Sequence, residues 1–325
     1  MKFAITGASG HIGANLCRTL IDQGHHVKAL INKYTRSLDQ LNLEVVKGNL
    51  LDTSSLSSLI KDVEIVIHLA ATISINGKND EELLAINVEG TRNLLQCIRE
   101  KPVRRLIHFS SIHAIVHEPL DSTLDETRGL AIEDHILYNK SKAVSEQLVL
   151  DAAEEGMDAV IINPTSVVGP NDFRPSLMGK ALLQIVKRKL PGLIPGGYDW
   201  VDVRDIVDGT LKAVEKGRTG ESYLLSGHWM SLPDLANMLG SLTGDQRKWT
   251  ILPYWLAELG VPFLKGYARL RCTDPLYTRE SLEILKTSHR MISSEKAQRE
   301  LGYSPRPLEE TIRDTLDWFR TNDYL

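Results

Sequence analysis

The first residues of this 325-residue chain join a short apolar segment, a glycine-rich turn and an amphipathic helix, and no other feature restricts the fold as strongly. Residues 2–6 have the length and composition of a buried β-strand and run directly into the turn Gly7–Gly13. The following residues place apolar side chains at helical spacing and reach Gly24, a typical helix C-cap. Strand, glycine turn and helix in this order are what a dinucleotide-binding site requires, although a plain strand–helix turn has the same outline.

Each glycine of the turn has a physical role in such a site. Gly7 permits a tight turn, Gly10 lets the backbone approach a diphosphate, and Gly13 lets the helix pack closely on the strand. The helix N-terminus adds free N–H groups and a partial positive charge, both of which attract phosphate. We therefore expect a dinucleotide to bind at this turn.

Strand-like and helical segments continue to alternate over the first two-thirds of the chain. This alternation predicts right-handed βαβ units and an α/β fold with a doubly wound parallel Rossmann sheet, which binds ligands at the carboxyl ends of its strands. The expected strands are Phe3–Thr6, His26–Ile31, Leu43–Lys47, Glu64–Leu69, Arg105–Ser110, Ala159–Ile162 and Ser222–Leu225, and the main helices are Asp80–Arg99 and His135–Glu154.

The pattern changes after Pro170, where Pro and Gly become frequent and one helical stretch, Leu177–Lys189, is expected. Trp200–Asp205 is expected to open a further helix, and from about residue 227 the pattern is mostly helical. We therefore predict an NAD(P)-binding Rossmann domain formed by residues 1–170 and about 201–226. A smaller, mostly helical substrate-binding part is expected to contain residues 171–200 and 227–325.

Composition and charge argue against several classes of protein. A net charge of −4 and a pI of about 6.2 indicate no basic surface for nucleic acid. The three cysteines are widely spaced without a metal-binding or disulfide pattern, which suits a reducing cytoplasm. A strand begins at once, so no signal peptide is expected. Charged residues interrupt the apolar stretch 251–270, which we expect to cover a pocket rather than to span a membrane.

Tyr138 and Lys142 are spaced by one helical turn, so both point from the same face of the expected helix. A phenol with an ordinary pKa of about 10 is a poor base at neutral pH, and a nearby cation lowers that pKa. The pair therefore predicts a proton-transfer device for an alcohol or a carbonyl. The alternative is that Tyr138 and Lys142 are solvated surface residues without a catalytic role. The predicted dinucleotide site favours the catalytic interpretation, because it would supply a hydride carrier.

Motifs in a fixed order over nearly the whole chain make it similar to the extended short-chain dehydrogenases/reductases, the NAD-dependent epimerase/dehydratase family. Within the family, the run from Asn163 to Pro170 most resembles dihydroflavonol and cinnamoyl-CoA reductases. Many nucleotide-sugar epimerases have an arginine at the position of Ile161, so the resemblance favours redox chemistry on a free substrate. The matching motifs are Thr6–Gly13, His68–Ala71, Asn87–Thr91, Phe109–Ser111, Tyr138 with Lys142, Asn163–Pro170 and Lys296–Pro305.

The resemblance implies roles for particular residues. Tyr138 is expected to be the catalytic acid/base, Lys142 to favour its phenolate and bind the nicotinamide ribose, and Ser111 to bind the substrate oxygen. Ser110 is the alternative hydroxyl, because successive strand residues face opposite sides. A homodimer formed through helices 80–99 and 135–154 is also implied. The implied cofactor-binding residues are Gly7, Ser9, Gly10, His11, Ile12, Gly13, Asn32, Lys33, Arg36, Asn49, Leu50, Leu69, Ala70, Ala71, Asn87, Tyr138, Lys142, Pro164, Thr165 and Val167.

The residues after the second strand favour NADP over NAD. An NAD enzyme usually has an acidic residue there that binds the ribose hydroxyls, whereas this chain has Lys33 and Arg36 and no acid before Asp39. Both cations suit the 2′-phosphate of NADP, which an acid would repel. NADP is the expected cofactor, and NAD remains the alternative.

Together these features predict an NAD(P)-dependent reductase of a ketone or aldehyde, or a dehydrogenase of a secondary alcohol, with a medium-sized, partly apolar substrate. A nucleotide-sugar epimerase or dehydratase with tightly held NAD is the second hypothesis, and a non-catalytic dinucleotide-sensing protein is the third. No metal is expected, and His113, close to Ser111, is interpreted as structural rather than as part of the substrate pocket. The resemblance implies that Asp202, Arg204 and Asp205 form a structural ion-pair group that ties the substrate-binding part to the core, and a charge cluster in the pocket is the alternative.

Overall fold

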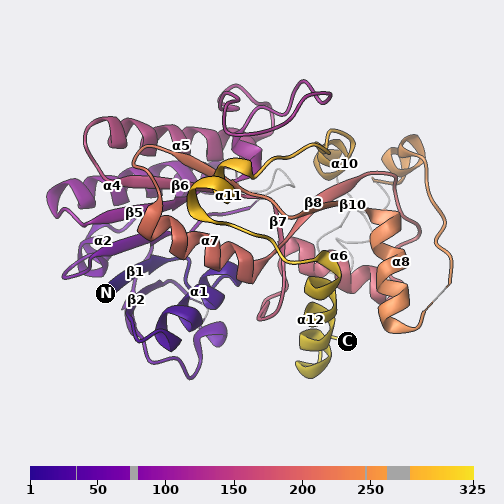
Figure 1. Cartoon of the computed structure of the whole chain (residues 1–325), viewed down its shortest axis with the longest axis horizontal. Coiled ribbons are helices and arrows are strands. Elements are labelled where there is room, and N and C mark those ends of the chain that lie inside the picture. The colour runs from indigo at the N-terminus through magenta and orange to yellow at the C-terminus, as the bar shows by residue number, and fades with distance from the viewer. Residues whose placement is uncertain (34, 74–79, 246, 262–278) are drawn as a thin grey trace.

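Seven parallel strands form the central sheet, in the order β3-β2-β1-β4-β5-β6-β9. The computed structural model describes residues 1–33, 35–73, 80–245, 247–261 and 279–325 (Figure 1). Every predicted strand is present and the predicted doubly wound sheet is confirmed. The strands are β1 (Lys2–Thr6), β2 (His26–Ile31), β3 (Glu44–Lys47), β4 (Ile65–His68), β5 (Arg105–Phe109), β6 (Ala159–Pro164) and β9 (Ser222–Leu225).

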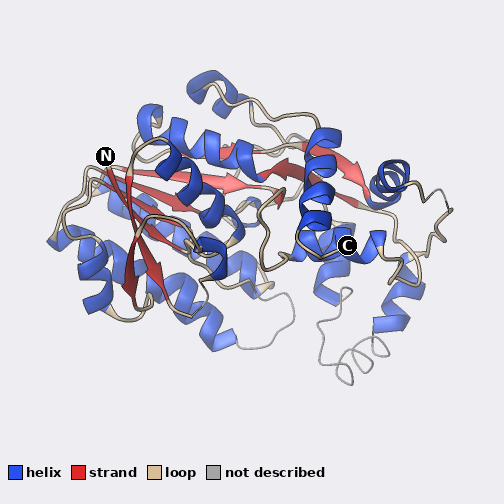
Figure 2. Ribbon diagram, turned by 90° about the horizontal axis from the view of Figure 1, so that it is seen from below, coloured by secondary structure: helices blue, strands red, loops and turns tan. Residues whose placement is uncertain are grey.

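Helices cover both faces of this sheet, as Figure 2 shows. Because both faces are buried, the strands are continuous apolar runs rather than alternating ones. One face carries α1 (His11–Asp22), α7 (Val203–Lys216) and α11 (Glu295–Leu301), and the other carries α2 (Thr53–Leu59), α4 (Gly90–Glu100) and α5 (Leu137–Glu154).

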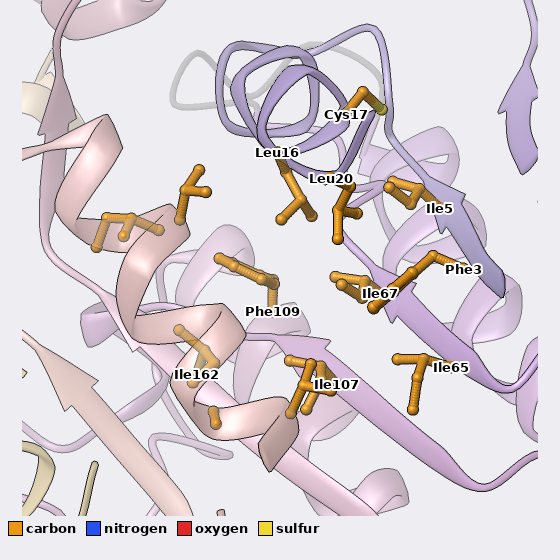
Figure 3. Close-up of a cluster of buried hydrophobic side chains, with 14 of the residues drawn as sticks. Phe3, Ile5, Leu16, Cys17, Leu20, Ile65, Ile67, Ile107, Phe109 and Ile162 are labelled. Atoms are coloured by element: carbon orange, nitrogen blue, oxygen red, sulfur yellow. The ribbon is translucent and has the colours of Figure 1, made fainter. Parts of the chain in front are cut away.

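The first strand illustrates how the core fixes the glycine turn. Phe3 and Ile5 point to the α1 face, where they join the cluster that contains Leu16 and Leu20 (Figure 3). Ala4, between them in the chain, belongs to the cluster on the opposite face. Strand and helix are therefore packed together on either side of the turn that connects them.

A second sheet of three strands, in the order β10-β8-β7, lies across the boundary between the two predicted parts, because residues 166–168 and 201–202 belong to the predicted Rossmann domain. This sheet was not predicted, and it corrects one boundary: Trp200–Asp202 ends strand β8, and helix α7 begins only at Val203. Trp200 is 1% exposed and pairs with both neighbouring strands, so sheet packing decides its conformation. The strands are β7 (Ser166–Val168), β8 (Gly197–Asp202) and β10 (His228–Ser231), and the surrounding helices are α6 (Leu177–Val186), α8 (Leu232–Thr243), α10 (Arg279–Lys286) and α12 (Leu308–Thr321).

The predicted helix over residues 80–99 is divided by a π-helical turn. It consists of α3 (Asp80–Leu84), the π-helix η2 (Ala85–Glu89) and α4. Such turns are often found at functional sites, and this one presents the side chain of Asn87 toward α5. Among the described residues, short 3₁₀ helices lie after β2, η1 (Arg36–Leu38), and after β5, η3 (Ile112–Ala114).

Ion pairs join the C-terminal segment to helix α7. Arg204 contacts Asp314 of α12 at 2.7 Å, and Arg306 contacts Asp205 at 2.9 Å. Arg204 also pairs with the fully buried Asp202. The structural ion-pair interpretation of these residues is therefore confirmed. We propose that the chain divides into the predicted Rossmann domain and substrate-binding part, and that these ion pairs connect the two.

The apolar stretch 251–270 is described only in its first part. Residues 254–261 are helical, and the side chains of Trp255 and Leu259 are each 62% exposed. Residues 262–270 lie outside the described residues, and with them much of the predicted pocket cover. Within the described ranges, no helix is both long and apolar enough to cross a membrane.

Candidate active site

The glycine turn is packed tightly against the end of β4. Gly7 has a φ of +71°, and a Cβ atom there would lie 2.6 Å from the backbone nitrogen of Ala70. A Cβ atom on Gly13 would collide with the carbonyl oxygen of Gly7. Gly10 differs, because a Cβ atom there would approach only that same oxygen, at 3.3 Å. The outer side of Gly10 is therefore the place where a ligand has access to the backbone.

The start of α1 has the features that a diphosphate needs. No side chain caps the helix at Gly10, and its first turn contains no acidic residue. A cavity of about 150 Å³ opens there, lined in part by Ser9, Gly10 and His11. The turn, the uncapped helix end and the cavity together fit the diphosphate of a dinucleotide. Ile12 follows in the first turn of the helix.

The loop after β2 adjoins the same cavity. The hydroxyl of Ser37 donates a hydrogen bond to the carbonyl oxygen of Ser9 at 2.9 Å, and Ser37 also lines the cavity. Asn32, Lys33 and Arg36 are all exposed on this loop. The residues predicted to bind the group at the 2′ position of the adenosine ribose thus lie on a loop that is hydrogen-bonded to the glycine turn.

The other predicted adenine-side residues occupy the ends of β3 and β4. The side chain of Asn49 accepts a hydrogen bond from the backbone N–H of Leu51 at 2.8 Å, and Leu50 is buried against Gly90. After β4, the N–H of Ala70 donates to the hydroxyl of Thr6 at 3.2 Å. These bonds fix the loop with Leu69, Ala70 and Ala71 beside the glycine turn.

The side chain of Asn87 forms hydrogen bonds within the protein that its sequence motif did not predict. Its amide accepts a hydrogen bond from the N–H of Thr72 at 2.8 Å and donates to the Thr72 carbonyl at 3.0 Å. It also donates to the hydroxyl of Ser141 at 3.0 Å. The side chain therefore connects the loop after β4 to helix α5, one turn from Tyr138.

Ser111 is the serine that lies next to the phenol of Tyr138. Burial raises the pKa of Tyr138, and a hydrogen bond with the Ser111 hydroxyl lowers it only in part. The Ser111 side chain also accepts a hydrogen bond from the N–H of His113 at 3.2 Å, which orients it. Ser110, by contrast, lies on the side of Glu146. The expectation that Lys142 lowers the pKa of Tyr138 is not met in the protein alone, because burial dominates.

Lys142 is held by the strand that precedes Ser111. Its ammonium group donates a hydrogen bond to the carbonyl oxygen of Phe109 at 2.5 Å. Burial lowers the pKa of Lys142 to about 8, although the carboxylate of Glu146 opposes this effect. The amine is therefore mostly protonated at neutral pH and loses its proton as the pH rises through about 8.

Sequence reasoning missed two buried residues that support this arrangement. The amide of Asn163 donates to the carboxylate of Glu146 at 2.8 Å and to the carbonyl oxygen of Ser111 at 3.2 Å. Glu146 accepts a further hydrogen bond from Ser222 at 2.9 Å, and burial raises its pKa. Glu146 follows Lys142 by one helical turn, so the spacing that identified Tyr138 and Lys142 also pointed to it.

The loop predicted to face the nicotinamide connects the two sheets. Pro164 ends β6, and the hydroxyl of Thr165 donates to the buried carboxylate of Asp199 at 2.6 Å. Asp199 also accepts from the N–H of Gly227 at 2.7 Å, and Val167 is half-buried in β7. The loop is thus fixed at the carboxyl end of the main sheet, where the other site residues lie.

His113, interpreted from its sequence context as structural, lines a cavity of about 450 Å³. Its ring lies edge-on to the Tyr138 ring, with centroids 6.1 Å apart, and is stacked on His117. Burial lowers the pKa of His113 to about 3, so the ring is neutral at physiological pH. In the described part of the chain, no group of three or more His, Cys, Asp or Glu residues is placed to hold a metal ion. The apolar lining of the cavity comes mainly from Val116, Leu130, Ala131, Ile132, Ile136 and Ile284.

Comparisons with known proteins identify the family and the fold. The family model "NAD dependent epimerase/dehydratase family" matches residues 3–226. The chain is 36% identical over 98% of both chains to sterol demethylase protein B from Methylococcus capsulatus. It is 31% identical, over 99% of its length and 96% of the relative's, to a putative dihydroflavonol 4-reductase from Synechocystis. The crystal structure of gox2253 superposes with a TM-score of 0.85 at 31% identity, covering 100% of this chain and 99% of the other.

Proposed function

This chain belongs to the NAD-dependent epimerase/dehydratase family of NAD(P)-dependent enzymes, and on that premise we propose that it reduces a ketone or aldehyde, or oxidises the corresponding secondary alcohol. The observation that carries the proposal is the contact between Ser111 and Tyr138 at the carboxyl end of the main sheet. Lys142, one turn from Tyr138, completes the predicted Ser-Tyr-Lys site.

The proposed chemistry assigns one task to each side chain. Bound NAD(P) supplies the hydride in reduction and accepts it in oxidation. The hydroxyl of Ser111 holds the substrate oxygen, and the phenol of Tyr138 gives that oxygen its proton in reduction or removes one in oxidation. Burial raises the pKa of Tyr138, so the phenol stays protonated at neutral pH and is ready to donate.

Lys142 has a positioning and an electrostatic task in this proposal. Its bond to Phe109 holds the ammonium group beside the strand end that leads to Ser111. A positive charge there stabilises the phenolate that remains after Tyr138 has given up its proton. Asn163 and Glu146 keep this strand end and helix α5 in register.

We propose NADP as the preferred cofactor. Lys33 and Arg36 are exposed on the loop after β2, where an NAD-specific enzyme usually has a carboxylate. Guanidinium and ammonium groups bind a phosphate strongly, whereas they gain little from two ribose hydroxyls. The side chain of Asn32 adds an uncharged hydrogen-bonding group at the same place.

The proposed substrate is a partly apolar small molecule rather than a nucleotide sugar. Support comes from the mostly apolar lining of the cavity beside His113. Two relatives with nearly full-length matches carry the names sterol demethylase protein B and putative dihydroflavonol 4-reductase, and the second is named as a reductase. A cavity of about 450 Å³ is large enough for part of a polycyclic or alkyl-substituted compound.

A carbonyl screen with NADPH and NADH in parallel tests this proposal. Purified protein is offered aliphatic, steroidal and flavonoid ketones, and cofactor oxidation is followed by absorbance. We expect consumption of one cofactor per product, with faster turnover on NADPH. Tightly retained NAD with no net consumption, and conversion of a nucleotide sugar, would establish the epimerase alternative instead.

We also propose a homodimer formed through α4 and α5, as the family resemblance implies. Polar side chains cover the exposed face of α4, and the pair Arg99–Glu155 links it to the end of α5. Light scattering after size exclusion is expected to give twice the chain mass of 36.3 kDa. A mass of one chain at micromolar concentration would exclude this dimer.

A further inference from the structure

The loop 170–174, at the boundary between the two predicted parts, is bonded directly to helix α1. The ring nitrogen Nε2 of His11 lies 3.0 Å from the carbonyl oxygen of Pro170, and the amide of Asn15 donates to the same oxygen at 3.1 Å. Asn171 in turn donates to the side-chain oxygen of Asn15 at 3.0 Å. Because a carbonyl oxygen only accepts, His11 must carry its proton on Nε2. The loop is therefore held against the helix end at which a diphosphate is expected.

The next residues of this loop are fixed from both sides. The guanidinium of Arg18 lies 5.1 Å from the centre of the Phe173 ring, and the Trp318 ring packs edge-on against the same ring at 5.1 Å. The phenol of Tyr324 donates to the Phe173 carbonyl at 2.5 Å. The position of the following residue, Arg174, is thereby determined by contacts to helices of both parts.

The side chain of Arg174 is exposed and, within the described ranges, forms no hydrogen bond or ion pair. The neighbouring carboxylate of Asp172 is engaged elsewhere, because it accepts hydrogen bonds from the N–H and the hydroxyl of Ser176, each at 2.8 Å. Arg174 lines the 150 Å³ cavity at the glycine turn, together with Ser9, Gly10 and Ser37, and none of the described residues that line it carries a carboxylate. This cavity thus has two positive walls, the start of α1 and the free guanidinium.

Given the NAD(P)-dependent function proposed above, we propose that Arg174 binds a phosphate of the adenosine half of the cofactor. The cofactor then joins the substrate-binding part to the Rossmann domain, because one wall of its phosphate site comes from each. A guanidinium suits this role, since it offers two parallel N–H donors to phosphate oxygens.

The position of the cavity favours the 2′-phosphate as the group bound. Ser37 belongs to the loop after β2, and in Rossmann folds this region faces the adenosine ribose. The diphosphate of the cofactor is the other group that Arg174 could bind, because Gly10 and His11 line the cavity as well. The two sources differ in one measurable respect: only NADP carries the 2′-phosphate.

Cofactor affinity of the full-length protein tests the inference without any substrate. NADPH and NADH are titrated by calorimetry into wild type, Arg174→Gln and Arg174→Lys, with Lys180→Gln as a matched control that removes an exposed cation from the adjacent helix α6. We expect Arg174→Gln to weaken NADPH binding by about tenfold or more, Arg174→Lys to restore part of it, and Lys180→Gln to change nothing.

Comparing the loss of affinity for NADPH with the loss for NADH shows which phosphate of the cofactor Arg174 binds. A loss confined to NADPH, with matching weaker competition by 2′-AMP, assigns Arg174 to the 2′-phosphate. An equal loss for NADH, with weaker competition by ADP, assigns it to the diphosphate. Unchanged affinities for both cofactors in Arg174→Gln would overturn the inference, whereas wild-type protein that binds neither cofactor would overturn the proposed function instead.

Thermal unfolding separates a binding effect from a folding defect. Because Arg174 makes no bond among the described residues, the Tm of free Arg174→Gln is expected to equal that of wild type. The rise in Tm caused by saturating NADPH in wild type is expected to shrink in the variant at the same cofactor concentration. A lowered Tm of the free variant would show that Arg174 acts through folding and would contradict the proposed role.

Discussion

The ammonium group of Lys142 donates a 2.5 Å hydrogen bond to the carbonyl oxygen of Phe109, the last residue of β5. This bond joins the helix that carries Tyr138 to the strand that leads into Ser111. A single carbonyl replaces only part of the hydration of an ammonium ion, so burial lowers the pKa of Lys142 to about 8. The family resemblance assigns Lys142 the role of stabilising a negative charge. Keeping Lys142 itself charged in this buried position is nevertheless costly in free energy.

Lys142→Met is expected to stabilise the free protein at neutral pH while abolishing turnover. The difference between a folded pKa of about 8 and the ordinary 10.5 corresponds to about 3 kcal/mol of burial cost. This cost is fully present below pH 8 and is relieved as pH rises from 8 to 10.5, because the unfolded chain then binds the additional proton. Allowing about 1 kcal/mol for the lost hydrogen bond, we expect a gain of about 2 kcal/mol at pH 7.

Urea unfolding at pH 7 and pH 10 measures this effect, with Lys180→Met as the control for an exposed lysine. The advantage of Lys142→Met over wild type should disappear at the higher pH. A constant difference between the two proteins at both pH values would show that Lys142 is not titrating in this range.

Asn163→Leu is expected to impair both stability and turnover. The substitution keeps the side-chain volume but removes the donor that serves the buried carboxylate of Glu146 and the carbonyl oxygen of Ser111. Leaving buried acceptors unpaired costs about 2–3 kcal/mol. Chemical unfolding and steady-state kinetics check the prediction, and the exposed Asn237→Leu serves as a control with no expected effect. If Asn163→Leu kept the kcat of wild type, Asn163 would not contribute to the arrangement of the active site.

Arg306→Met tests the connection between the C-terminal segment and helix α7. It leaves the carboxylate of Asp205, whose side chain is 6% exposed, without its cation. Removing one partner of a buried ion pair costs about 3–5 kcal/mol. Arg313→Met removes an exposed pair with Glu309 and is expected to cost less than about 1 kcal/mol. Equal free energies of unfolding for the two variants would mean that the buried pair is not what joins the two parts.

Gly13→Ala tests the packing of the dinucleotide turn. A methyl group at this position collides with the carbonyl oxygen of Gly7 and with Ala8, so the turn must open. We expect a lower Tm and at least a tenfold loss of NADPH affinity, read by calorimetry. Gly129→Ala is the control, because no atom of the described residues lies within 4 Å of the added methyl group. Unchanged cofactor affinity in Gly13→Ala would argue against diphosphate binding at this turn.

The main sheet could be predicted from the sequence because its strands are buried on both faces. Runs such as His26–Ile31 and Ser222–Leu225 are mostly apolar and end in buried apolar residues, and both were predicted with the ends that the structure has. The three-stranded sheet could not be predicted in the same way. Its strands are three to six residues long, and the conformation of Trp200 depends on partners that are distant in the chain.

The candidate site was predicted in its residue types but not in its electrostatics. Regular spacing pointed to Tyr138 and Lys142, and the same spacing extends to Glu146. Their pKa values, however, depend on burial, which only the packed structure determines. Asn163 was matched only as part of a motif and Arg174 was given no role, because the carboxylate of Glu146 and the cavity at the glycine turn become their neighbours only on folding.

Tyr138→Phe tests the central claim most directly. With NADPH and the best ketone from the screen, we expect kcat to fall roughly 100-fold or more, because the proton donor is gone. Calorimetric affinity for NADPH should stay within about twofold of wild type, and Tyr223→Phe, which removes a phenol bonded to Glu300 away from the site, should retain full turnover. Wild-type kcat in Tyr138→Phe, with cofactor binding intact, would contradict the proposed mechanism.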